Sequence, residues 1–419
     1  MEALRAPLRE LGEFEEIQGR LKKREPVCLG ISGCVDSQKL HMIYGLSEGF
    51  RYKLIITYSD QRMREIYEDY KFYDRNVSMY PAKDLIFFQA DIHGNQLVTD
   101  RWKVLRRILE GVPMTIVTTL DCLMEPQIPL GQIEKDILHI SASGQIQEKE
   151  LAEKLVTLGY EKTYQVEVPG QFSIRGGIVD IFDLTEENPY RIELWGEDVD
   201  SIRSFDVLSQ RSIEKLSSVD IYPATEMILT KDKRARGMHL IELEAKKQEE
   251  ALRAQGKIEE AARLHRQIGE LREEVLELEA KVNLESYVRY FYQEMGSFLG
   301  NFDRNESCIF LDEPVRIEEH AKAVELEFRE SMSHRLEKGY LLPGQMTLLY
   351  GSGETAARMS DYPVVTIASL DMKNPFMRPD RKYDFSAKSI SPYNNSFETL
   401  VKDLRMYKKN GNRVLLLSA

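Results

Sequence analysis

The stretch GQFSIRGGIVDIFDLTEENPYRIELWGEDVDSIRSFDVLSQRS (Gly170–Ser212) decides the fold at the centre of this 419-residue chain. It contains three runs in which apolar and polar residues alternate, FSIRGGIVDIF, YRIELWG and VDSIRSFD, separated by the turn signals EENP and GED. Alternation with a period of two and short polar turns are typical of an antiparallel meander. Together with the polar helical run that precedes it, the meander predicts an α+β module over residues 131–223.

One strand of this meander presents two different faces. The apolar residues of YRIELW point to one side, which we assign to the core, and Arg191 and Trp195 point to the other side. Arg175 lies on a neighbouring strand, just before Gly176-Gly177, where a bulge or a close backbone approach is expected. Arginine and tryptophan are enriched at the hot spots of protein interfaces.

Two interpretations of these side chains remain open from the residues alone. In the first, Trp195 packs beneath a local helix and the arginines form ion pairs with nearby acidic residues, namely Glu193, Glu197 or Asp198. In the second, Arg175, Arg191 and Trp195 form a surface that binds another protein.

The first 130 residues alternate between strand and helix patterns. Short runs rich in Ile, Val, Phe and Thr predict buried strands at PVCLGIS (26–32), YKLIITY (52–58), DLIFFQA (84–90) and MTIVTTL (114–120). Helical stretches lie between them, including residues 60–71 and 102–109. This alternation predicts a parallel sheet that helices cover on both faces.

The first predicted strand leads into Gly30-Ile-Ser-Gly-Cys-Val-Asp-Ser37, where a phosphate-binding loop would lie. A working loop reads G-x-x-x-x-G-K-[ST], and its lysine reaches the β and γ phosphates. Gly30 and Ser37 match the outer positions, but Val35 replaces the second glycine and Asp36 replaces the lysine. An anion there repels a polyphosphate, a change on the order of several kcal/mol. Lys39 lies one helical turn further, and we expect it to point elsewhere.

The run IFLDEP (309–314) supports the same conclusion. A strand that ends in Asp312-Glu313 resembles the arrangement that holds Mg²⁺ and a catalytic water in nucleotide hydrolases. Asp-Glu after an apolar strand is also a common strand-end turn. Without the loop lysine, we expect no ATP hydrolysis, no nucleotide binding and no cofactor in this chain.

From residue 224 the chain becomes helical. Apolar residues three and four apart form a heptad-like seam: Ala261, Leu264, Ile268, Leu271, Val275, Leu278 and Val282. Gly256 is expected to divide two helices of an antiparallel hairpin, which either packs on its own domain or binds a partner as a coiled coil. The strand run SCIFLDEP (307–314) then predicts a return to the α/β core, so residues 224–350 are assigned to its second half.

Residues 351–419 are expected to contain a linker and the start of a further, incomplete α/β domain. The runs MTLLYG (346–351) and PVVTIAS (363–369) predict strands, and a linker containing Pro and Asn follows Asp371. The sequence ends on a predicted helix and the apolar strand RVLLLSA (413–419). Because a buried strand needs neighbours, we expect the sequence to be truncated here.

Composition bounds the class of protein. Hydrophobic residues make up 42% and charged residues 30%, which is typical of a globular protein in water. No apolar run reaches the roughly 18 residues of a membrane helix, and no signal-peptide core begins the chain. Four scattered cysteines predict reduced thiols and a cytoplasmic location. The net charge of −12 favours protein partners over a chain-wide nucleic-acid surface.

Several of these runs together resemble the UvrB-homology module of the transcription-repair coupling factors. They are QFSIRGGIVDIF, NPYRIELWGEDVDSIRSFDVLSQRS, IYPATE (221–226), YPAKDLIFFQADIHG (80–94) and IFLDEP. The resemblance extends in order from about residue 11 to residue 419. It implies a degenerate helicase-like parallel α/β domain in two sequence halves, 1–130 and 224–350, with an inserted antiparallel α+β module at 131–223. Residues 351–419 would be the start of a truncated third α/β domain.

The resemblance also implies a function for the inserted module. In this family the module binds the repair protein UvrA, and Arg175, Arg191 and Trp195 match the UvrA-contacting positions. This region would then recruit nucleotide excision repair to stalled RNA polymerase without hydrolysing ATP itself. The family's ATP- and Mg²⁺-dependent DNA translocase and its polymerase-binding domain would be absent here. RNA polymerase and double-stranded DNA would therefore be partners of the complete protein, and no membrane contact is implied.

One feature of UvrB itself is missing. Its tyrosine-rich hairpin, which inserts at damaged DNA, would follow the strand near residues 84–90. Residues 91–102, DIHGNQLVTDRW, contain no tyrosine, so we do not expect this chain to read lesions directly.

Two other functions compete with the docking function. A DNA-dependent ATPase of the helicase class would need the loop lysine that Asp36 replaces. A DNA-binding scaffold would need a basic surface, and the pI near 5.3 argues against one. The runs 22–24 and 101–107 could still form a local basic patch.

Overall fold

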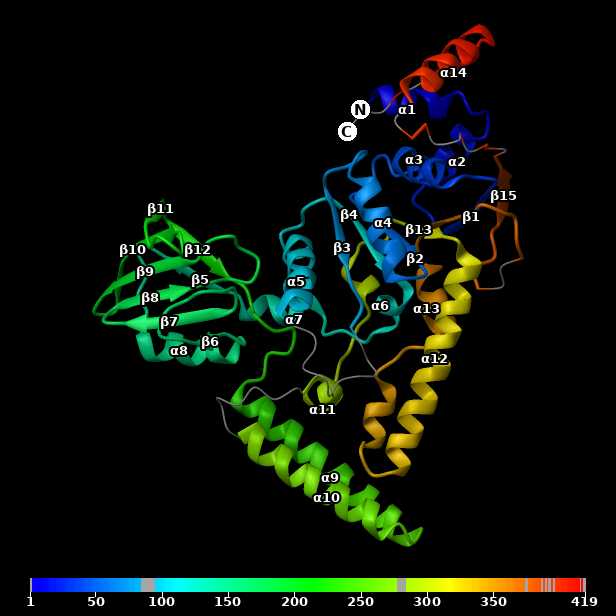
Figure 1. Cartoon of the computed structure of the whole chain (residues 1–419). Coiled ribbons are helices and arrows are strands. Elements are labelled where there is room, and N and C mark those ends of the chain that lie inside the picture. The colour runs from blue at the N-terminus through cyan, green and yellow to red at the C-terminus, as the bar shows by residue number, and fades with distance from the viewer. Residues whose placement is uncertain are drawn as a thin grey trace.

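The computed structural model describes residues 2–416 except 84–94, 277–283, 374–375, 386, 389, 391–392, 395 and 415. Figure 1 shows a large α/β domain, an antiparallel module to its left and a long helical hairpin below. Within this described part of the chain, no helix has the length and apolar character to cross a membrane. The predicted strand at residues 84–90 lies outside the described residues.

The α/β domain is built on a seven-stranded sheet in the order β15-β1-β14-β13-β2-β4-β3, in which every pair is parallel. The strands are β1 (Val27–Ser32), β2 (Tyr52–Thr57), β3 (Val77–Tyr80), β4 (Met114–Thr119), β13 (Ser307–Asp312), β14 (Pro363–Ile367) and β15 (Arg381–Asp384). All residues of β4, β13 and β14 are buried, as expected of parallel strands covered on both sides.

Helices cover both faces of this sheet, as the sequence predicts. One face packs against α1 (Glu2–Arg9), α2 (Phe14–Leu21), α3 (Asp36–Leu46) and α4 (Asp60–Tyr70). The other face packs against α5 (Asn95–Leu109), α6 (Leu120–Met124), α12 (Pro314–Glu337) and α13 (Ser352–Met359). The short elements α7 (Leu130–Ile133), η1 (Glu134–Asp136), η2 (Glu285–Tyr287), α11 (Val288–Phe291) and η3 (Phe298–Asn301) connect the larger ones.

The structure corrects the boundary at residue 350. β14 lies inside the sheet between β1 and β13, and β15 pairs with the other side of β1. Residues 363–384 therefore complete the α/β domain instead of beginning another. The reason is physical, because β1 and β13 would leave unpaired backbone groups in the core without β14.

Two predicted strands near the end of the chain do not form as expected. The run MTLLYG overlaps a 3-10 helix, η4 (Pro343–Thr347), in which Gln345 Oε1 accepts a hydrogen bond from the Leu342 backbone at 2.8 Å. The described residues of RVLLLSA, 413, 414 and 416, are not in a strand, and the others lie outside the described residues. The helix predicted before this run is α14 (Phe397–Lys409), which has no buried residue.

The inserted module is the predicted antiparallel α+β unit. Its sheet has the order β11-β10-β9-β8-β7-β6 and packs against α8 (Glu148–Thr157). The strands are β6 (Glu161–Lys162), β7 (Gln171–Arg175), β8 (Ile178–Ile181), β9 (Tyr190–Trp195), β10 (Asp198–Phe205) and β11 (Ser212–Leu216). A second sheet of two strands, β5 (Leu138–Ser141) and β12 (Ser218–Ile221), joins the ends of the module.

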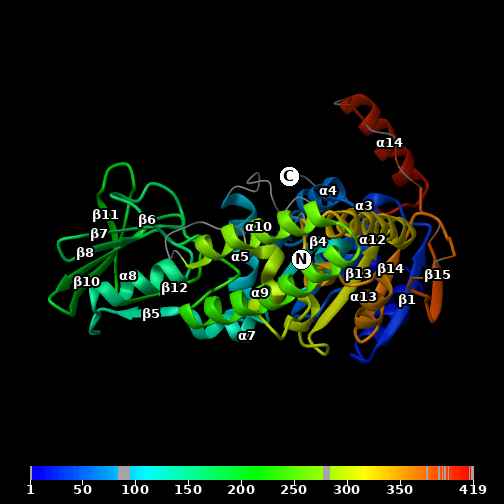
Figure 2. The ribbon, with the colours of Figure 1, turned by 90° about the horizontal axis from the view of Figure 1, so that it is seen from below.

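The helical region forms the predicted antiparallel hairpin of α9 (Lys231–Ala254) and α10 (Ile258–Leu276). Gly256 has a φ of +77° in the turn between them, a conformation that glycine adopts without strain. The described seam residues of α10 are buried, and Leu278 and Val282 lie outside the described residues. Arg263 donates to the Lys338 carbonyl at 2.6 Å, so the hairpin packs on its own domain. Figure 2, seen from below, shows it running from near the module to in front of the α/β domain.

Candidate docking face and degenerate nucleotide site

The outer face of the six-stranded sheet carries the predicted arginines and tryptophan. The strand register aligns Ser173, Asp180, Arg191 and Arg203 across β7, β8, β9 and β10. A second row aligns Arg175, Ile178 and Glu193. Since side chains two residues apart share a face, Arg175, Arg191 and Trp195 lie on one side of the sheet, opposite the buried apolar residues that pack against α8.

A buried carboxylate holds the two arginines. Asp180 has no exposed surface, and its oxygens accept from Arg191 Nε at 2.7 Å, Arg191 Nη2 at 2.8 Å and Arg175 Nη2 at 3.1 Å. Arg191 also donates to Gln210 Oε1 at 2.8 Å, and its guanidinium lies 4.1 Å from the centre of the Phe205 ring. The hydrogen bonds to Asp180 raise the pKa of Arg191, so its positive charge is fixed.

The arginines therefore have a different partner from those that the first interpretation named. The Glu193 carboxylate accepts from Arg203 and from Ser201, which lie beside it on β10. These contacts lower the pKa of Glu193, the Ser201 hydrogen bond most of all. Sequence reasoning missed Asp180. The two-residue turn of the β7–β8 hairpin indicates that Asp180 faces Ser173, but nothing in the sequence fixes the register of β8 against β9.

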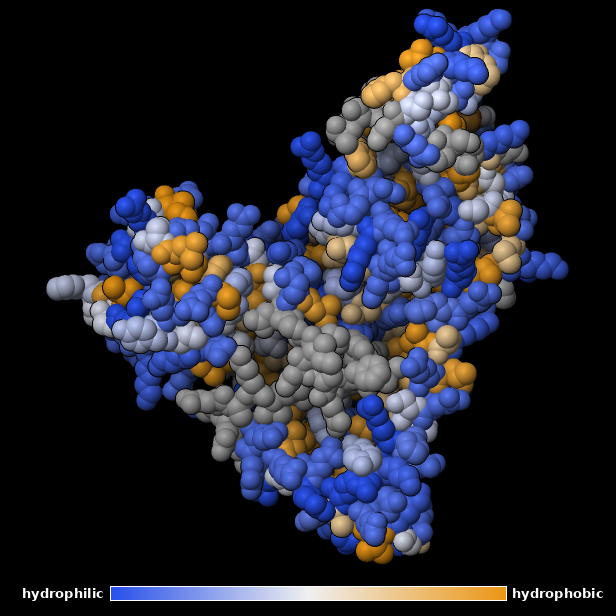
Figure 3. All heavy atoms as spheres, in the orientation of Figure 1, coloured by the Kyte–Doolittle hydropathy of each residue, from blue (hydrophilic) through white to orange (hydrophobic). Residues whose placement is uncertain are grey.

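Trp195 lies in water at the end of β9. Its exposed fraction is 84%, and Gly196 turns the chain directly after it with a φ of +66°. It does not pack beneath a helix, so the structure contradicts that part of the first interpretation. Tyr164 is 83% exposed on the same module, and the Arg175 guanidinium lies 5.4 Å from its ring centre. Figure 3 shows hydrophobic side chains on the module near β11, where Leu208 and Ile213 are also exposed.

The degenerate phosphate loop lies between β1 and α3, as predicted. Val35 precedes α3, Asp36 is its first residue, and both Asp36 and Ser37 face solvent. Residues 379 and 385 of the same chain pack against the glycines of the loop. A Cβ added at Gly33 would lie 2.2 Å from the Phe385 carbonyl oxygen, and one at Gly30 would lie 2.8 Å from the Pro379 ring. The Phe385 backbone therefore packs directly against Gly33, and the Pro379 ring packs directly against Gly30.

The expectation for Lys39 was wrong. Its side chain is buried and points into the site, where Nζ donates to Asp36 at 3.1 Å, Asp312 at 3.4 Å and Glu313 at 2.5 Å. Positions 36 and 39 lie on the same face of α3, and the carboxyl end of β13 faces this helix. Burial acts to lower the pKa of Lys39, but the attraction of Asp312 and Glu313 raises it above its ordinary value.

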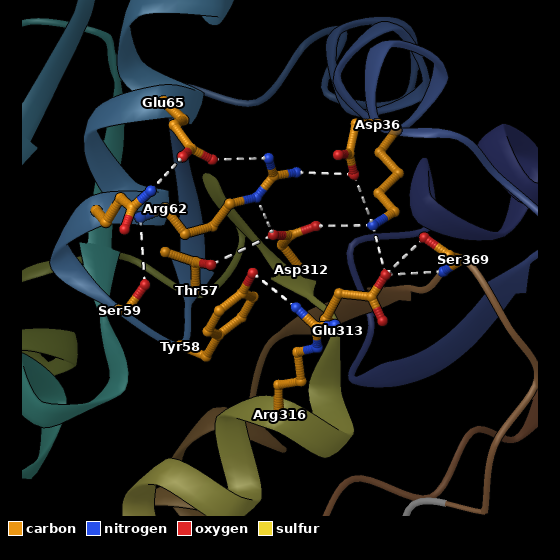
Figure 4. A network of polar contacts seen from close by, with 12 residues as sticks. Asp36, Thr57, Tyr58, Ser59, Arg62, Glu65, Asp312, Glu313, Arg316 and Ser369 are labelled. Atoms are coloured by element: carbon orange, nitrogen blue, oxygen red, sulfur yellow. Dashed lines mark hydrogen bonds and ion pairs between the residues drawn. The ribbon is translucent and has the colours of Figure 1, made fainter. Parts of the chain in front are cut away.

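Arg62 of α4 supplies a second cation. Its Nε donates to Asp312 at 2.9 Å and its Nη2 donates to Asp36 at 3.0 Å, while Thr57 donates to Asp312 at 3.2 Å (Figure 4). Glu313 has a left-handed φ of +59° and also accepts from the Ser369 backbone at 2.9 Å. The acidic pair Asp312-Glu313, which resembles a magnesium-binding arrangement in sequence, is thus satisfied by a lysine and an arginine of the same chain.

One predicted basic run does not form a basic surface. Arg101 is buried and pairs with Glu226 at 2.6 Å and with Glu125 at 3.0 Å. Arg106 pairs with Glu110 at 2.7 Å and Glu186 at 2.5 Å. These arginines hold the module against the α/β domain, and their charges are compensated.

Comparison with known proteins places these sites in context. Residues 138–227 match the family described as the UvrB interaction domain, which begins with β5 and includes the whole six-stranded sheet. The chain is 28% identical over 432 aligned residues to the transcription-repair-coupling factor of Bacillus subtilis (strain 168). This alignment covers 100% of this chain and 35% of that protein. It is 28% identical over 342 residues to the transcription-repair-coupling factor of Staphylococcus aureus (strain MRSA252). That alignment covers 81% of this chain and 28% of the relative. The chain spans about a third of the length of these relatives.

Proposed function

We propose that this chain docks the repair protein UvrA, because it is similar along its whole length to a transcription-repair-coupling factor and its residues 138–227 match the UvrB interaction domain. The docking face consists of Arg175, Arg191 and Trp195 on the outer side of the module. Through it, this region recruits nucleotide excision repair to stalled RNA polymerase. Contacts with the polymerase and with double-stranded DNA belong to other parts of a complete coupling factor.

One observation carries this proposal. The domain matched at residues 138–227 is the module on which two ordered arginines and a tryptophan that is 84% exposed share one face of a sheet. An exposed tryptophan leaves a large apolar surface in water, which burial in a partner pocket would remove. Arginine and tryptophan at the centre of an interface commonly contribute most of its binding energy.

The proposal includes no ATP hydrolysis by this region. Asp36 stands where a nucleotide-binding lysine would be, and the Lys39 ammonium occupies the space between the carboxylates that would hold a metal ion. A metal-bound nucleotide at the carboxyl end of β13 would have to displace the Lys39 ion pairs. The chain acts as a binding module in this proposal, and catalysis would require another domain.

Titration calorimetry of the chain with UvrA tests the proposal. We expect the double variant Arg175→Ala, Arg191→Ala to lose about 2 kcal/mol or more of binding free energy, as hot-spot residues do. Arg203→Ala is the matched control, because Arg203 lies on the same face but pairs with Glu193. Equal binding by the double variant and the unmodified chain would exclude these arginines, and no binding by the unmodified chain would exclude the function.

A further inference from the structure

We propose that Asp180 is a positioning residue of the docking face, which orders Arg175 and Arg191 before the partner arrives. The inference rests on the proposed function and assigns a role to a residue that does not itself reach the partner. Asp180 is fully buried beneath the guanidinium groups, so it acts through them.

The position of Asp180 across the sheet gives it this control. It lies on β8, between β7, which carries Arg175, and β9, which carries Arg191. Asp180 is the direct register partner of Arg191. Its two oxygens accept three hydrogen bonds from the two arginines. A buried carboxylate is costly unless charged donors surround it, so the two arginines stabilise Asp180 in its buried position.

The charges in this group do not cancel. Two guanidinium groups share one carboxylate, which leaves one net positive charge near the surface. The Arg175 side chain is 35% exposed and the Arg191 side chain is 14% exposed. The group therefore suits a partner that brings one carboxylate within reach of both arginines. Asp180 sets the plane in which each guanidinium meets that carboxylate.

Removal of the Asp180 charge has two opposite effects on binding. The docking face gains positive charge, which strengthens long-range attraction to an acidic partner but is screened at physiological salt beyond a Debye length of about 8 Å. The arginines lose their common anchor and must then be ordered by the partner. Ordering two long side chains weakens binding by roughly five- to hundredfold. The second effect is larger, so affinity falls.

The test compares Asp180→Asn with Glu193→Gln in the full chain, titrated with UvrA. We expect Asp180→Asn to weaken binding about tenfold, mainly through a faster dissociation rate. Glu193→Gln removes a carboxylate from the same face that pairs with Arg203 instead, and it should change affinity less than about twofold. The substitution Asp180→Asn is also made in the Arg175→Ala, Arg191→Ala background, where it should have no further effect, because Asp180 acts only through these arginines.

A second measurement checks the positioning without UvrA. Hydrogen exchange of arginine Nε–H groups, followed by NMR in the full chain labelled with ¹⁵N-arginine, should be slow for Arg191 and faster in Asp180→Asn. If Asp180→Asn fails to fold, Gln210→Ala replaces it, since Gln210 holds the same guanidinium from the surface. Gln210→Ala should then weaken binding by roughly threefold.

The outcomes separate this inference from the function it rests on. Normal affinity in a folded Asp180→Asn chain, together with loss of binding by the double arginine variant, overturns the role of Asp180 and leaves UvrA docking intact. An equal loss on both backgrounds indicates a merely structural aspartate and also overturns the role. Absence of binding by the unmodified chain overturns both proposals.

Discussion

The Lys39 side chain occupies the degenerate nucleotide site, although the sequence still resembles a phosphate-binding loop there. The pattern places Asp36 at the lysine position of the phosphate loop, which predicts repulsion of nucleotide. The structure adds that Lys39, three residues later, turns back and pairs with Asp312 and Glu313. The side chains of Lys39 and Asp312 are both 2% exposed. Removing one partner of an ion pair this deeply buried destabilises the fold, because the other charge is left in the core without compensation.

Substitution of Lys39 by methionine should therefore destabilise the chain. The variant leaves Asp312 and Glu313 short of a cation, and we expect the free energy of unfolding to fall by about 3 kcal/mol. Urea unfolding followed by circular dichroism measures this change, with Lys23→Met as the matched control at an exposed lysine. Calorimetry should detect no ATP binding by either variant, because Asp36 remains at the lysine position of the loop. Full stability of Lys39→Met would contradict the closed site.

The candidate docking residues could be read from the sequence, but their anchor could not. Strand alternation alone places Arg191 and Trp195 on the face opposite the core, and the structure has them there. The sequence does not predict that Asp180 binds the arginines, because β8 and β9 are joined by a long loop. The strand register across such a loop depends on tertiary packing. A residue becomes a partner of Arg191 only when that register is known.

At the scale of elements, a buried charge cluster joins the inserted module to the α/β domain. Arg101 of α5 contacts Glu125, which follows α6, and Glu226, which follows β12. Burial raises the pKa of Glu125 to about 7, although Arg101 and Lys83 oppose this effect. Burial also acts to raise the pKa of Glu226, but Arg101 and Lys83 outweigh it and lower that pKa to about 2.

The two glutamates therefore give opposite pH dependences in separate ranges. The pKa of Glu125 is raised from its ordinary value of 4.5 to about 7 in the folded chain, so the free energy of unfolding should fall as pH rises from about 4.5 to about 7. Glu226 contributes stability that is lost only as pH falls below about 4.5 toward 2. Glu125→Gln should remove the first dependence, which amounts to at most about 1.4 kcal/mol per pH unit. Urea unfolding between pH 5 and 7.5 measures it, and identical slopes in the two chains would contradict the assignment.

The elements themselves were predicted best where the periodicity was long and uniform. The meander, the hairpin around Gly256 and the buried strands β1, β2, β4 and β13 all follow from apolar spacing. The strand β14 was recognised but assigned to another domain, because sequence order gives no sign that it lies between β1 and β13. The run MTLLYG has strand-like composition, yet the preceding Pro343-Gly344 and the Gln345 side chain favour a helical turn.

At the scale of the whole molecule, the docking face stands away from the α/β domain. Figures 1 and 2 show the module projecting to one side of the α/β domain. The helical hairpin lies below the region where the two meet in Figure 1. The chain carries a net charge of −12, so the positive group around Arg175 and Arg191 is a local feature on an acidic protein. Recognition of an acidic partner would therefore depend on short-range contacts at this face more than on the field of the whole chain.

Fluorine NMR of the chain labelled with 5-fluorotryptophan tests the central claim most directly. The chain has two tryptophans, and the structure buries Trp102 completely and leaves Trp195 84% exposed. A soluble gadolinium complex should broaden the Trp195 signal, assigned with Trp195→Phe, and spare Trp102. Saturating unlabelled UvrA should shift the Trp195 signal and protect it from gadolinium. A Trp195 signal that stays fully accessible while UvrA is bound would show that UvrA docks elsewhere.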